Sequence, residues 1–272
     1  MESALLEIEH LTVHYVVDEV VVEAVNDLSL EIQQGECVGL VGETGAGKTT
    51  TALAIMGLVP SPPGKIVSGR IRYRGDDLVG KSMKEMRKIR GSAISMVFQD
   101  PMTSLNPVAR IGDQIMEVIL LHNKISRGEA TVRSQQMLEL VGIPANRYEE
   151  YPHQFSGGMR QRVAVARALA LDPVLLLMDE PFGALDAQTR NMLQQELLGI
   201  WEKTRKTVVF ITHSVDEAVF LSDRIIVLTS RPGRICRIFP VELPRPRDRT
   251  SVEFGQVRRD VLDLINQNCS IQ

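Results

Sequence analysis

The sequence lacks several features that would place it in a specialised class of proteins. It has no run of about 18 apolar residues, so no segment is expected to span a membrane. The start, MESALLEIEH, is acidic where a secretory signal would be basic and then apolar. Positive charge is not in excess, because the formal net charge is −3, and this argues against a protein that coats nucleic acid.

Cysteine is also scarce. Cys37, Cys236 and Cys269 lie far apart and form no metal-ligand spacing, so we expect separate thiols in a reducing compartment and no disulfide framework. The composition that is present, 44% hydrophobic and 24% charged residues, is typical of a globular protein with a sizeable core. A length of 272 residues favours one large domain or two small ones.

Short apolar runs that end in a polar residue or glycine recur along the chain, at CVGLVG (37–42), ISMVFQD (94–100), VLLLMDE (174–180) and VVFITH (208–213). Such runs are typical of strands that are buried on both faces. Helical patterns alternate with them at 47–58, 158–170 and 186–204. This alternation predicts an α/β fold with a mostly parallel core sheet.

The remaining segments differ from this pattern. Alternating residues at 4–17, 20–32 and 69–78 predict antiparallel strands, and VPSPPGKIVSG (59–69) predicts a loop. Between Gln99 and Ser156 the chain is rich in helix formers and has no strand signal, which predicts a helical insert. A short amphipathic helix is expected at 252–267.

The segment GETGAGKT matches the pattern G-x-x-x-x-G-K-[ST] through Gly42, Gly47, Lys48 and Thr49. It follows a predicted strand and opens a predicted helix, as a phosphate-binding loop requires. Glycines let backbone N–H groups converge on phosphate oxygens, Lys48 adds a positive charge, and the Thr49 hydroxyl can ligate Mg²⁺. The alternative is a tight glycine turn without a ligand.

The apolar run VLLLMDE delivers Asp179 to the end of a strand, where its carboxylate can hold Mg²⁺. Adjacent strand residues point to opposite faces, so unless the chain turns here, Asp179 and Glu180 cannot ligate one ion. We therefore expect Asp179 to hold the metal and Glu180 to polarise the attacking water. A solvated strand end is the plainer alternative.

Gln99 and His213 also end predicted strands. Ligands of open α/β sheets bind at the carboxyl ends of the strands, so we expect Gly42, Gln99, Asp179 and His213 to converge on one edge. Gln99 offers an oxygen to the metal or water, and His213 a ring N–H to the γ-phosphate. A structural role is the alternative for each.

A second anion-binding pattern lies in QFSGGMRQR (154–162). Ser156, Gly157 and Gly158 open a predicted helix, whose first N–H groups lack internal partners and carry the positive end of the helix dipole. An ordinary serine N-cap followed by a glycine turn is the alternative.

These motifs together resemble the ATP-binding cassette (ABC) ATPases over essentially the whole chain. GETGAGKTT resembles Walker A, VFQD the Q-loop, FSGGMRQR the signature, VLLLMDEP Walker B, GALD the D-loop and THS the H-loop, in family order. The resemblance implies a P-loop NTPase fold with an antiparallel β subdomain and a helical subdomain. One ATPase domain would cover 1–251, with the helical subdomain at about 100–160, and a C-terminal helix and tail would cover 252–272.

The resemblance also implies a pair of cassettes in which the signature of one closes over ATP held by the other. Ser156, Gly157 and Gly158 would then bind γ-phosphate in trans, and Asp186 would touch the partner's site. Tyr15 is the candidate for stacking on adenine, although His14 beside it leaves the register open. The ATP and Mg²⁺ contacts would come from Gly42, Glu43, Thr44, Gly45, Ala46, Gly47, Lys48, Thr49, Thr50, Gln99 and Asp179. Phe155 and Met159 replace the leucine and glutamine that are commonest in the family signature.

As to substrate, MRKIRGSAISMVFQDPMTSLNPV and YPHQFSGGMRQR resemble ATPases of peptide and nickel importers. From about residue 163 on, the chain resembles ATPases of nitrate, sulfonate and taurine importers. We expect a peptide or nickel importer, since the earlier region would receive the permease, and keep the other class as the alternative. Expected partners are permease subunits, a second ATPase subunit and, indirectly, a substrate-binding protein. The expected location is the cytoplasmic face of the inner membrane, as a peripheral subunit.

Cassette ATPases that act on nucleic acid or the ribosome are a distant alternative. The nucleic-acid clamps carry long coiled-coil or zinc-bearing insertions, and no heptads or CxxC pairs occur between Gln99 and Ser156. The ribosome-binding class joins two cassettes in one chain, and this sequence carries one set of motifs. We therefore expect no nucleic-acid partner.

Overall fold

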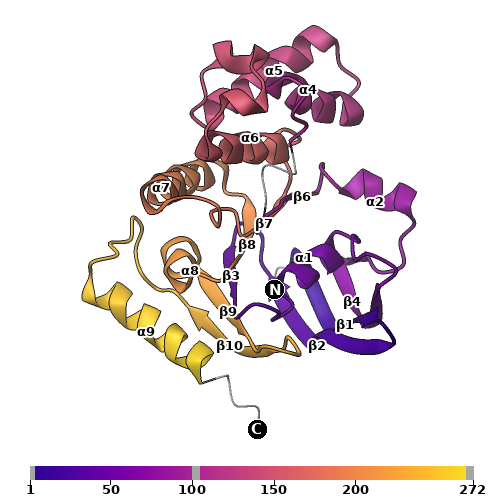
Figure 1. The fold of residues 1–272 in the computed structure, drawn as a ribbon, viewed down its shortest axis with the longest axis vertical. Helices are drawn as coiled ribbons and strands as arrows, with labels where there is room; N and C mark the ends of the chain where they lie inside the picture. The colour runs from indigo at the N-terminus through magenta and orange to yellow at the C-terminus, as the bar shows by residue number, and fades with distance from the viewer. Residues whose placement is uncertain (1–3, 100–104, 268–272) are drawn as a thin grey trace. The chain divides into compact units, whose positions relative to one another are not determined.

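The computed structural model describes residues 4–99 and 105–267. The chain forms two compact units: a first unit of residues 1–86 and 207–272, and a second unit of residues 87–206. Figure 1 colours the chain from its N-terminus to its C-terminus and labels most helices and strands of both units. Within the described ranges, no helix is long and apolar enough to cross a membrane.

The first unit contains a four-stranded antiparallel sheet in the order β2-β1-β4-β5. Its strands are β1 (Leu6–Val17), β2 (Val20–Ile32), β4 (Gly64–Tyr73) and β5 (Asp76–Asp77). Leu6, Ile8, Leu11 and Val13 are buried along β1, with more exposed residues between them, as a sheet with one covered face requires. The antiparallel prediction is confirmed.

The predicted loop at 59–69 is wrong in its second half, because β4 begins at Gly64. Residues of this segment pair with β1, for example Ile66 with Val13 and Lys65 with His14. Pairing with a neighbouring strand therefore decides the structure here, against the local glycine and proline signal.

The first unit also holds parallel strands. β3 (Cys37–Val41) pairs in parallel with both β8 (Thr207–Thr212) and β9 (Arg224–Leu228), and β10 (Ile235–Pro240) pairs antiparallel with β9. Every residue of β3 and β8 is buried. This matches the continuous apolarity of their sequences, and the predicted α/β class with a mostly parallel core is confirmed.

The helices of the first unit are α1 (Lys48–Ile55), α8 (Val215–Leu221) and α9 (Val252–Asn266). Helix α8 packs on β3 and β8, and α9 packs on α8 and β9 through the buried side chains of Phe254 and Val261. Helix α2 (Met83–Ile89) spans the boundary between the two units.

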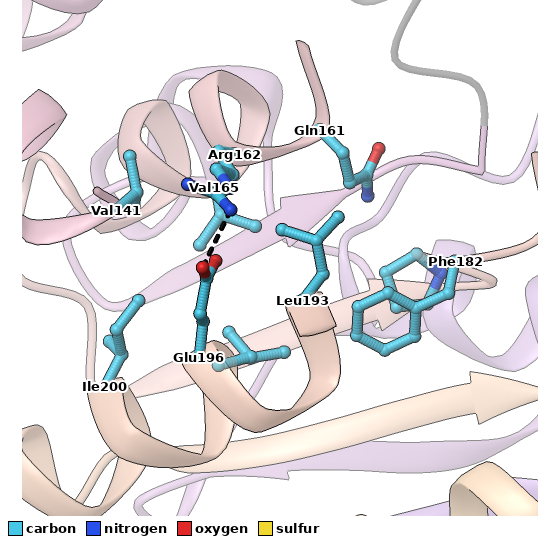
Figure 2. Close-up of a pocket in the computed structure, with 10 residues that line it drawn as sticks. Val141, Gln161, Arg162, Val165, Phe182, Leu193, Glu196 and Ile200 are labelled. Atoms are coloured by element: carbon cyan, nitrogen blue, oxygen red, sulfur yellow. Dashed lines mark hydrogen bonds and ion pairs between the residues drawn. The ribbon is translucent and has the colours of Figure 1, made fainter. Parts of the chain in front are cut away.

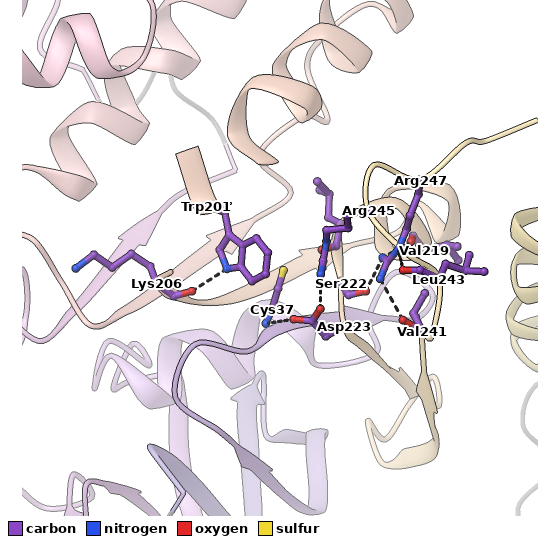
Figure 3. A network of polar contacts seen from close by, with 11 residues as sticks. Cys37, Trp201, Lys206, Val219, Ser222, Asp223, Val241, Leu243, Arg245 and Arg247 are labelled. Atoms are coloured by element: carbon purple, nitrogen blue, oxygen red, sulfur yellow. Dashed lines mark hydrogen bonds and ion pairs between the residues drawn. The ribbon is translucent and has the colours of Figure 1, made fainter. Parts of the chain in front are cut away.

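A C-terminal strap, defined here as residues 243–249, holds α8 through arginines (Figure 3). Arg247 is buried and donates hydrogen bonds to the carbonyl oxygens of Val219 and Ser222, both 2.6 Å away. Arg245 forms an ion pair with Asp223, whose other oxygen accepts a hydrogen bond from the backbone N–H of Cys37. The strap thus satisfies carbonyl groups at the end of α8 with the buried guanidinium of Arg247.

The cysteine expectations hold only in part. Cys37 is buried and free, and burial raises the pKa of its thiol, with the nearby charge of Asp223 adding to the rise. Cys236 is disulfide-bonded, so the expectation of three separate thiols is wrong for it. Cys269 lies outside the described residues. Within the described residues no group of three or more His, Cys, Asp or Glu side chains has the arrangement of a metal site.

The second unit combines two parallel strands with a group of helices. β6 (Ile94–Val97) pairs with β7 (Leu175–Asp179), and α6 (Gly157–Leu169) packs on β6. Helices α4 (Ile111–His122) and α5 (Arg127–Leu140) pack on each other and on α6 (Figure 1). Helix α7 (Ala187–Thr204) and the 3₁₀ turns at Ala145–Glu149 and Pro152–Gln154 complete the unit.

Candidate functional site

The loop between β3 and α1 has the geometry of a phosphate cradle. Gly45 and Gly47 have φ angles of 88° and 73°, in the left-handed region that favours glycine. The Lys48 ammonium is buried and donates to the carbonyl oxygens of Gly42 at 2.7 Å and Glu43 at 2.8 Å. The exposed side of the loop, residues 43–45, leaves backbone groups open to a ligand.

Gly47 is also required by a close approach of the backbone. A Cβ atom at this position would lie 2.4 Å from the carbonyl oxygen of Ala24 and 2.8 Å from Val25 Cγ2. Strand β2 therefore supports the loop directly, and no larger residue fits at Gly47.

Tyr15 lies beside the first turn of α1. Its hydroxyl oxygen is 3.5 Å from Oγ1 of Thr50, two residues after Lys48. The neighbouring His14 has its ring 3.8 Å from the carboxylate of Glu23 instead. Of the two candidates for an adenine contact, Tyr15 is thus the one that lies near the phosphate loop, and its stacking on adenine stays a prediction.

His213 stands at the end of β8, next to the phosphate loop in sheet order. Val41 pairs with Thr212, so the residues that follow them, Gly42 and His213, leave the same edge of the sheet. The turn is fixed by a 2.6 Å hydrogen bond from Thr212 Oγ1 to the buried carboxylate of Glu217. The His213 side chain is exposed, as a group that meets a ligand must be.

In the second unit, β7 ends at Asp179, which is only 2% exposed, and the chain then turns. Glu180 has a φ of 43°, so the alternation of strand faces that separates Asp179 from Glu180 in an extended chain does not apply at this point. A non-glycine residue in the left-handed region carries strain of the kind that gathers at functional sites.

Gln99 and Glu180 are brought together in the second unit. The Gln99 side-chain amide donates to Glu180 Oε2 at 3.0 Å. This follows from the pairing of Val97 with Met178, which places strands β6 and β7 side by side just before each polar residue. With its nitrogen donating to Glu180, the amide keeps its oxygen as an acceptor for a metal or water. Asp100, the last residue of the VFQD motif, lies outside the described residues.

Ser156 caps α6, because its hydroxyl accepts a hydrogen bond from the backbone N–H of Met159 at 3.3 Å. Ser156 and Gly157 are exposed, whereas Gly158 is buried and packs closely on α7: a Cβ there would lie 2.7 Å from Thr189 Cγ2. The serine cap and the exposed helix N-terminus thus coexist, and binding of phosphate there stays a prediction.

The two departures from the family signature have packing roles. Phe155 is buried, 3% exposed, with the Arg147 guanidinium 4.3 Å from its ring centroid. Met159 places its sulfur 3.3 Å from Nη1 of the same arginine. Arg147 in turn pairs with Glu150, so these residues anchor the segment that precedes α6.

Helices α6 and α7 are joined by an ion pair between Arg162 and Glu196 at 2.7 Å, beside an apolar cavity of about 20 Å³ (Figure 2). Leu193 and Phe182 line the cavity together with the side chain of Gln161. This volume suits about one water molecule, so the cavity is no nucleotide site.

Asp186 is the N-cap of α7. Its Oδ1 accepts hydrogen bonds from the backbone N–H groups of Thr189 at 3.0 Å and Gln188 at 3.1 Å. The hydrogen bonds from Thr189, followed by that from Gln188, hold the pKa of this carboxyl below its usual range. Its contact with a partner subunit stays a prediction.

Each unit therefore gathers part of the predicted site. The first unit holds the phosphate loop, Tyr15 and His213, and the second holds Gln99, Asp179, Glu180, the signature and Asp186. That both parts meet on one nucleotide stays a prediction. The sequence motifs did not predict the hydrogen bond between Gln99 and Glu180, although parallel pairing of the strands that precede these residues could have indicated it. The motifs also did not indicate the turn after β9, which carries no motif of its own.

Comparison with known proteins places these features in a family. Residues 25–183 match the family model described as ABC transporter. The oligopeptide transport ATP-binding protein OppD of Bacillus subtilis is 43% identical over 228 residues, which are 83% of this chain and 64% of that protein. This chain thus spans less than two thirds of that relative. An uncharacterized ABC transporter ATP-binding protein of Methanocaldococcus jannaschii, MJ0412, is 43% identical over 96% of this chain and 91% of its own length.

Solved structures agree with the fold. The dimeric, post-hydrolysis structure of the ATP-binding cassette MJ0796 bound to ADP and Pi has a TM-score of 0.77 and 29% identity, and covers 88% of this chain and 100% of its own. CbiO1 of Clostridium perfringens, described as part of the ABC transporter complex cbiONQ, has a TM-score of 0.76 and 25% identity, with 98% of both chains covered.

Proposed function

This chain belongs to the ABC transporter family, and on that premise we propose that it is the ATP-hydrolysing subunit of a peptide importer. The observation that carries the proposal is the phosphate loop, whose left-handed glycines and buried Lys48 form a cradle at the start of α1. Relatives named as oligopeptide and dipeptide transport ATP-binding proteins, each about 40% identical, favour peptides over nitrate, sulfonate or taurine. Nickel stays open as a second substrate of this class.

The residues divide the chemistry between them. Lys48 and the loop N–H groups bind the β- and γ-phosphates. Glu180 polarises the attacking water, and Gln99 orients its carboxylate through their 3.0 Å hydrogen bond. His213, on its fixed turn, donates to the γ-phosphate. Catalysis then rests on positioning and on stabilising charge, as in other phosphoryl transfers.

Thr49, Gln99 and Asp179 would hold Mg²⁺. Their hydroxyl, amide and carboxylate oxygens are the hard ligands this ion prefers, and Mg²⁺ commonly takes one or two protein carboxylates together with phosphate oxygens. When bound, the ion neutralises charge on the phosphates.

The proposal includes assembly with a second ATPase subunit, in which Ser156, Gly157 and Gly158 bind the γ-phosphate held by the partner and Asp186 contacts its site. The exposed N-terminus of α6 supports this part. Membrane permease subunits would bind the assembly at the cytoplasmic face of the membrane, and a substrate-binding protein would deliver the peptide.

ATP hydrolysis by the purified chain tests the activity. Lys48→Ala is expected to abolish it, and near-normal turnover in that variant would refute the role of the loop. Glu180→Gln should keep ATP binding and lose turnover, because the amide cannot polarise water, and should accumulate as a dimer with Mg-ATP in size-exclusion chromatography. A monomer at saturating Mg-ATP would contradict the paired assembly. Stimulation of turnover by a co-purified peptide permease, compared with a sulfonate permease, tests the substrate class.

A further inference from the structure

The turn between β9 and β10 lies against the phosphate loop, within the first unit. The Gly233 N–H donates to the carbonyl oxygen of Ala24 at 3.2 Å, and the Asn26 N–H donates to the carbonyl oxygen of Gly233 at 3.0 Å. A Cβ atom on Gly233 would lie 2.3 Å from the carbonyl oxygen of Ala46, in the loop itself. The turn, strand β2 and the phosphate loop therefore form one packed group.

The turn is fixed internally by the Thr229 side chain. Its hydroxyl donates to the carbonyl oxygen of Pro232 at 2.7 Å and accepts from the Arg234 N–H at 3.0 Å. The Thr229 N–H also donates to the carbonyl oxygen of Arg234 at 2.9 Å. The residues between these bonds thus have a defined position relative to the loop.

Arg231 occupies the tip of this turn with a φ of 45°, in the left-handed region where a non-glycine residue is strained. Its guanidinium lies beside Gly45 of the phosphate loop: a Cβ atom on Gly45 would be 3.1 Å from Arg231 Nε and 3.7 Å from Nη2. The Arg231 side chain is exposed. Within residues 4–99 and 105–267 it forms no hydrogen bond or ion pair, including with Glu43 of the same loop.

The position of this cation needs an explanation, because Lys48 already places a positive charge in the loop. Two cations beside one set of backbone N–H groups repel each other, and within the described residues no carboxylate balances Arg231. An anion bound in the loop would balance the charge of Arg231. A guanidinium is suited to this role because it donates to two phosphate oxygens at once and keeps its charge at any working pH.

We propose that Arg231 is a further phosphate-binding residue, which donates hydrogen bonds to the phosphate oxygens of a nucleoside triphosphate held in the loop. Arg231 extends the site with a positive group that comes from a turn about 180 residues after the loop in sequence. The inference rests on the proposed function, since it assumes that the loop binds a nucleotide. The inference gives the turn after β9 two roles: the turn adds positive charge to the phosphate loop, and it holds the loop in place.

The test is the dissociation constant of ATP for the full-length chain, measured by displacement of a fluorescent nucleotide. Arg231→Ala should weaken binding about 5- to 10-fold, the loss expected for a partly exposed charge-assisted hydrogen bond. Arg231→Lys should recover part of the loss, because it restores the charge without the planar fork. Arg234→Ala is the matched control: it removes an exposed arginine from the same turn and should leave the affinity within twofold of the wild type.

Salt dependence separates an electrostatic role from a merely structural one. The difference between the wild type and Arg231→Ala should shrink as NaCl rises to about 1 M, where the Debye length falls to about 3 Å. Arg231→Ala binding within twofold of the wild type at low salt would overturn the inference. So would a loss that salt does not change, or an equal loss in Arg234→Ala.

Lys48→Ala distinguishes a failure of the Arg231 inference from a failure of the proposed function. If the wild type does not bind ATP, or Lys48→Ala binds it equally well, the proposed function fails. If both behave as expected and Arg231→Ala still binds like the wild type, only the Arg231 inference fails. Arg231→Gln, which keeps the size of the side chain, replaces the alanine variant if the latter is poorly folded.

Discussion

Gly233→Ala should damage ATP turnover by moving the phosphate loop. The added Cβ would lie 2.3 Å from the carbonyl oxygen of Ala46 and 3.0 Å from that of Ala24. Both atoms belong to the backbone, so no side chain can rotate away. An ordinary contact begins near 3.4 Å, so the loop or the turn must move by about 1 Å.

A displacement of about 1 Å at a reacting site can lower the rate by about 100-fold, which corresponds to about 2.7 kcal/mol of lost transition-state stabilisation. We therefore expect kcat/KM for ATP to fall by about that factor in Gly233→Ala. The overlap should also cost about 1–3 kcal/mol of folding stability, as overpacking does elsewhere. Circular dichroism and the melting temperature are measured first, so that turnover is compared between folded proteins.

Gly255→Ala is the matched control for this experiment. It adds the same methyl group to helix α9 of the same unit, where nothing lies within 4 Å of the new Cβ. It should keep normal turnover and gain up to about 1 kcal/mol of stability, because alanine favours a helix. A folded Gly233→Ala variant whose kcat/KM lies within about threefold of the wild type would refute the reasoning, because a threefold change is far below the loss of about 100-fold expected for a displacement of about 1 Å.

Three further predictions concern other parts of the chain. Burial raises the pKa of the Cys37 thiol, so Cys37 should resist maleimide at pH 8 in the folded protein and react on unfolding, as mass spectrometry of the peptides will show. The backbone hydrogen bond from Thr189 lowers the pKa of Asp186, so the stability lost in Asp186→Ala at neutral pH should shrink as the pH falls through the folded-state pKa, in chemical denaturation. Gly112→Ala should lower the melting temperature, because its Cβ would lie 2.0 Å from the Tyr148 ring, an overlap worth at least about 1–3 kcal/mol.

Each of these predictions has a control and a contradicting result. Labelling of Cys37 in the folded protein as fast as in urea would contradict its burial. Asp186→Asn keeps an N-cap acceptor without the titrating group, so its stability should exceed that of the alanine variant and change less with pH. Gly128→Ala in α5, where a Cβ would meet only Ser126 Oγ at 4.0 Å, should be tolerated, and equal melting of Gly112→Ala and Gly128→Ala would refute the overlap.

Local sequence was sufficient to predict the phosphate loop and the strand ends. The buried run before Gly42 and the glycine spacing predict a strand, a loop and a helix, and the structure has all three. Parallel pairing then carries neighbouring strand ends to one edge, which explains why His213 follows β8 beside Gly42 and why Gln99 meets Glu180. These outcomes follow from the apolar pattern of each strand and from the parallel pairing of neighbouring strands.

Other features depend on tertiary contacts that local sequence does not encode. The left-handed turn at Glu180 removes the alternation of faces that an extended strand would have, and β4 begins inside a segment with a strong loop signal. The approach of Arg231 to Gly45 joins residues that are far apart in the chain, and neither neighbourhood signals it. Such contacts become visible only when the strands are placed in a sheet.

The most direct test of the central claim is a structure of the Glu180→Gln protein assembled with Mg-ATP. The measured quantity is the distance from the Gly157 amide nitrogen to the γ-phosphate oxygens of a nucleotide in the other subunit's phosphate loop. We predict a hydrogen bond of about 2.7–3.2 Å. A closed assembly in which this amide lies more than about 6 Å from every γ-phosphate, or contacts only the nucleotide of its own chain, would contradict the account, because neither distance permits a hydrogen bond in trans.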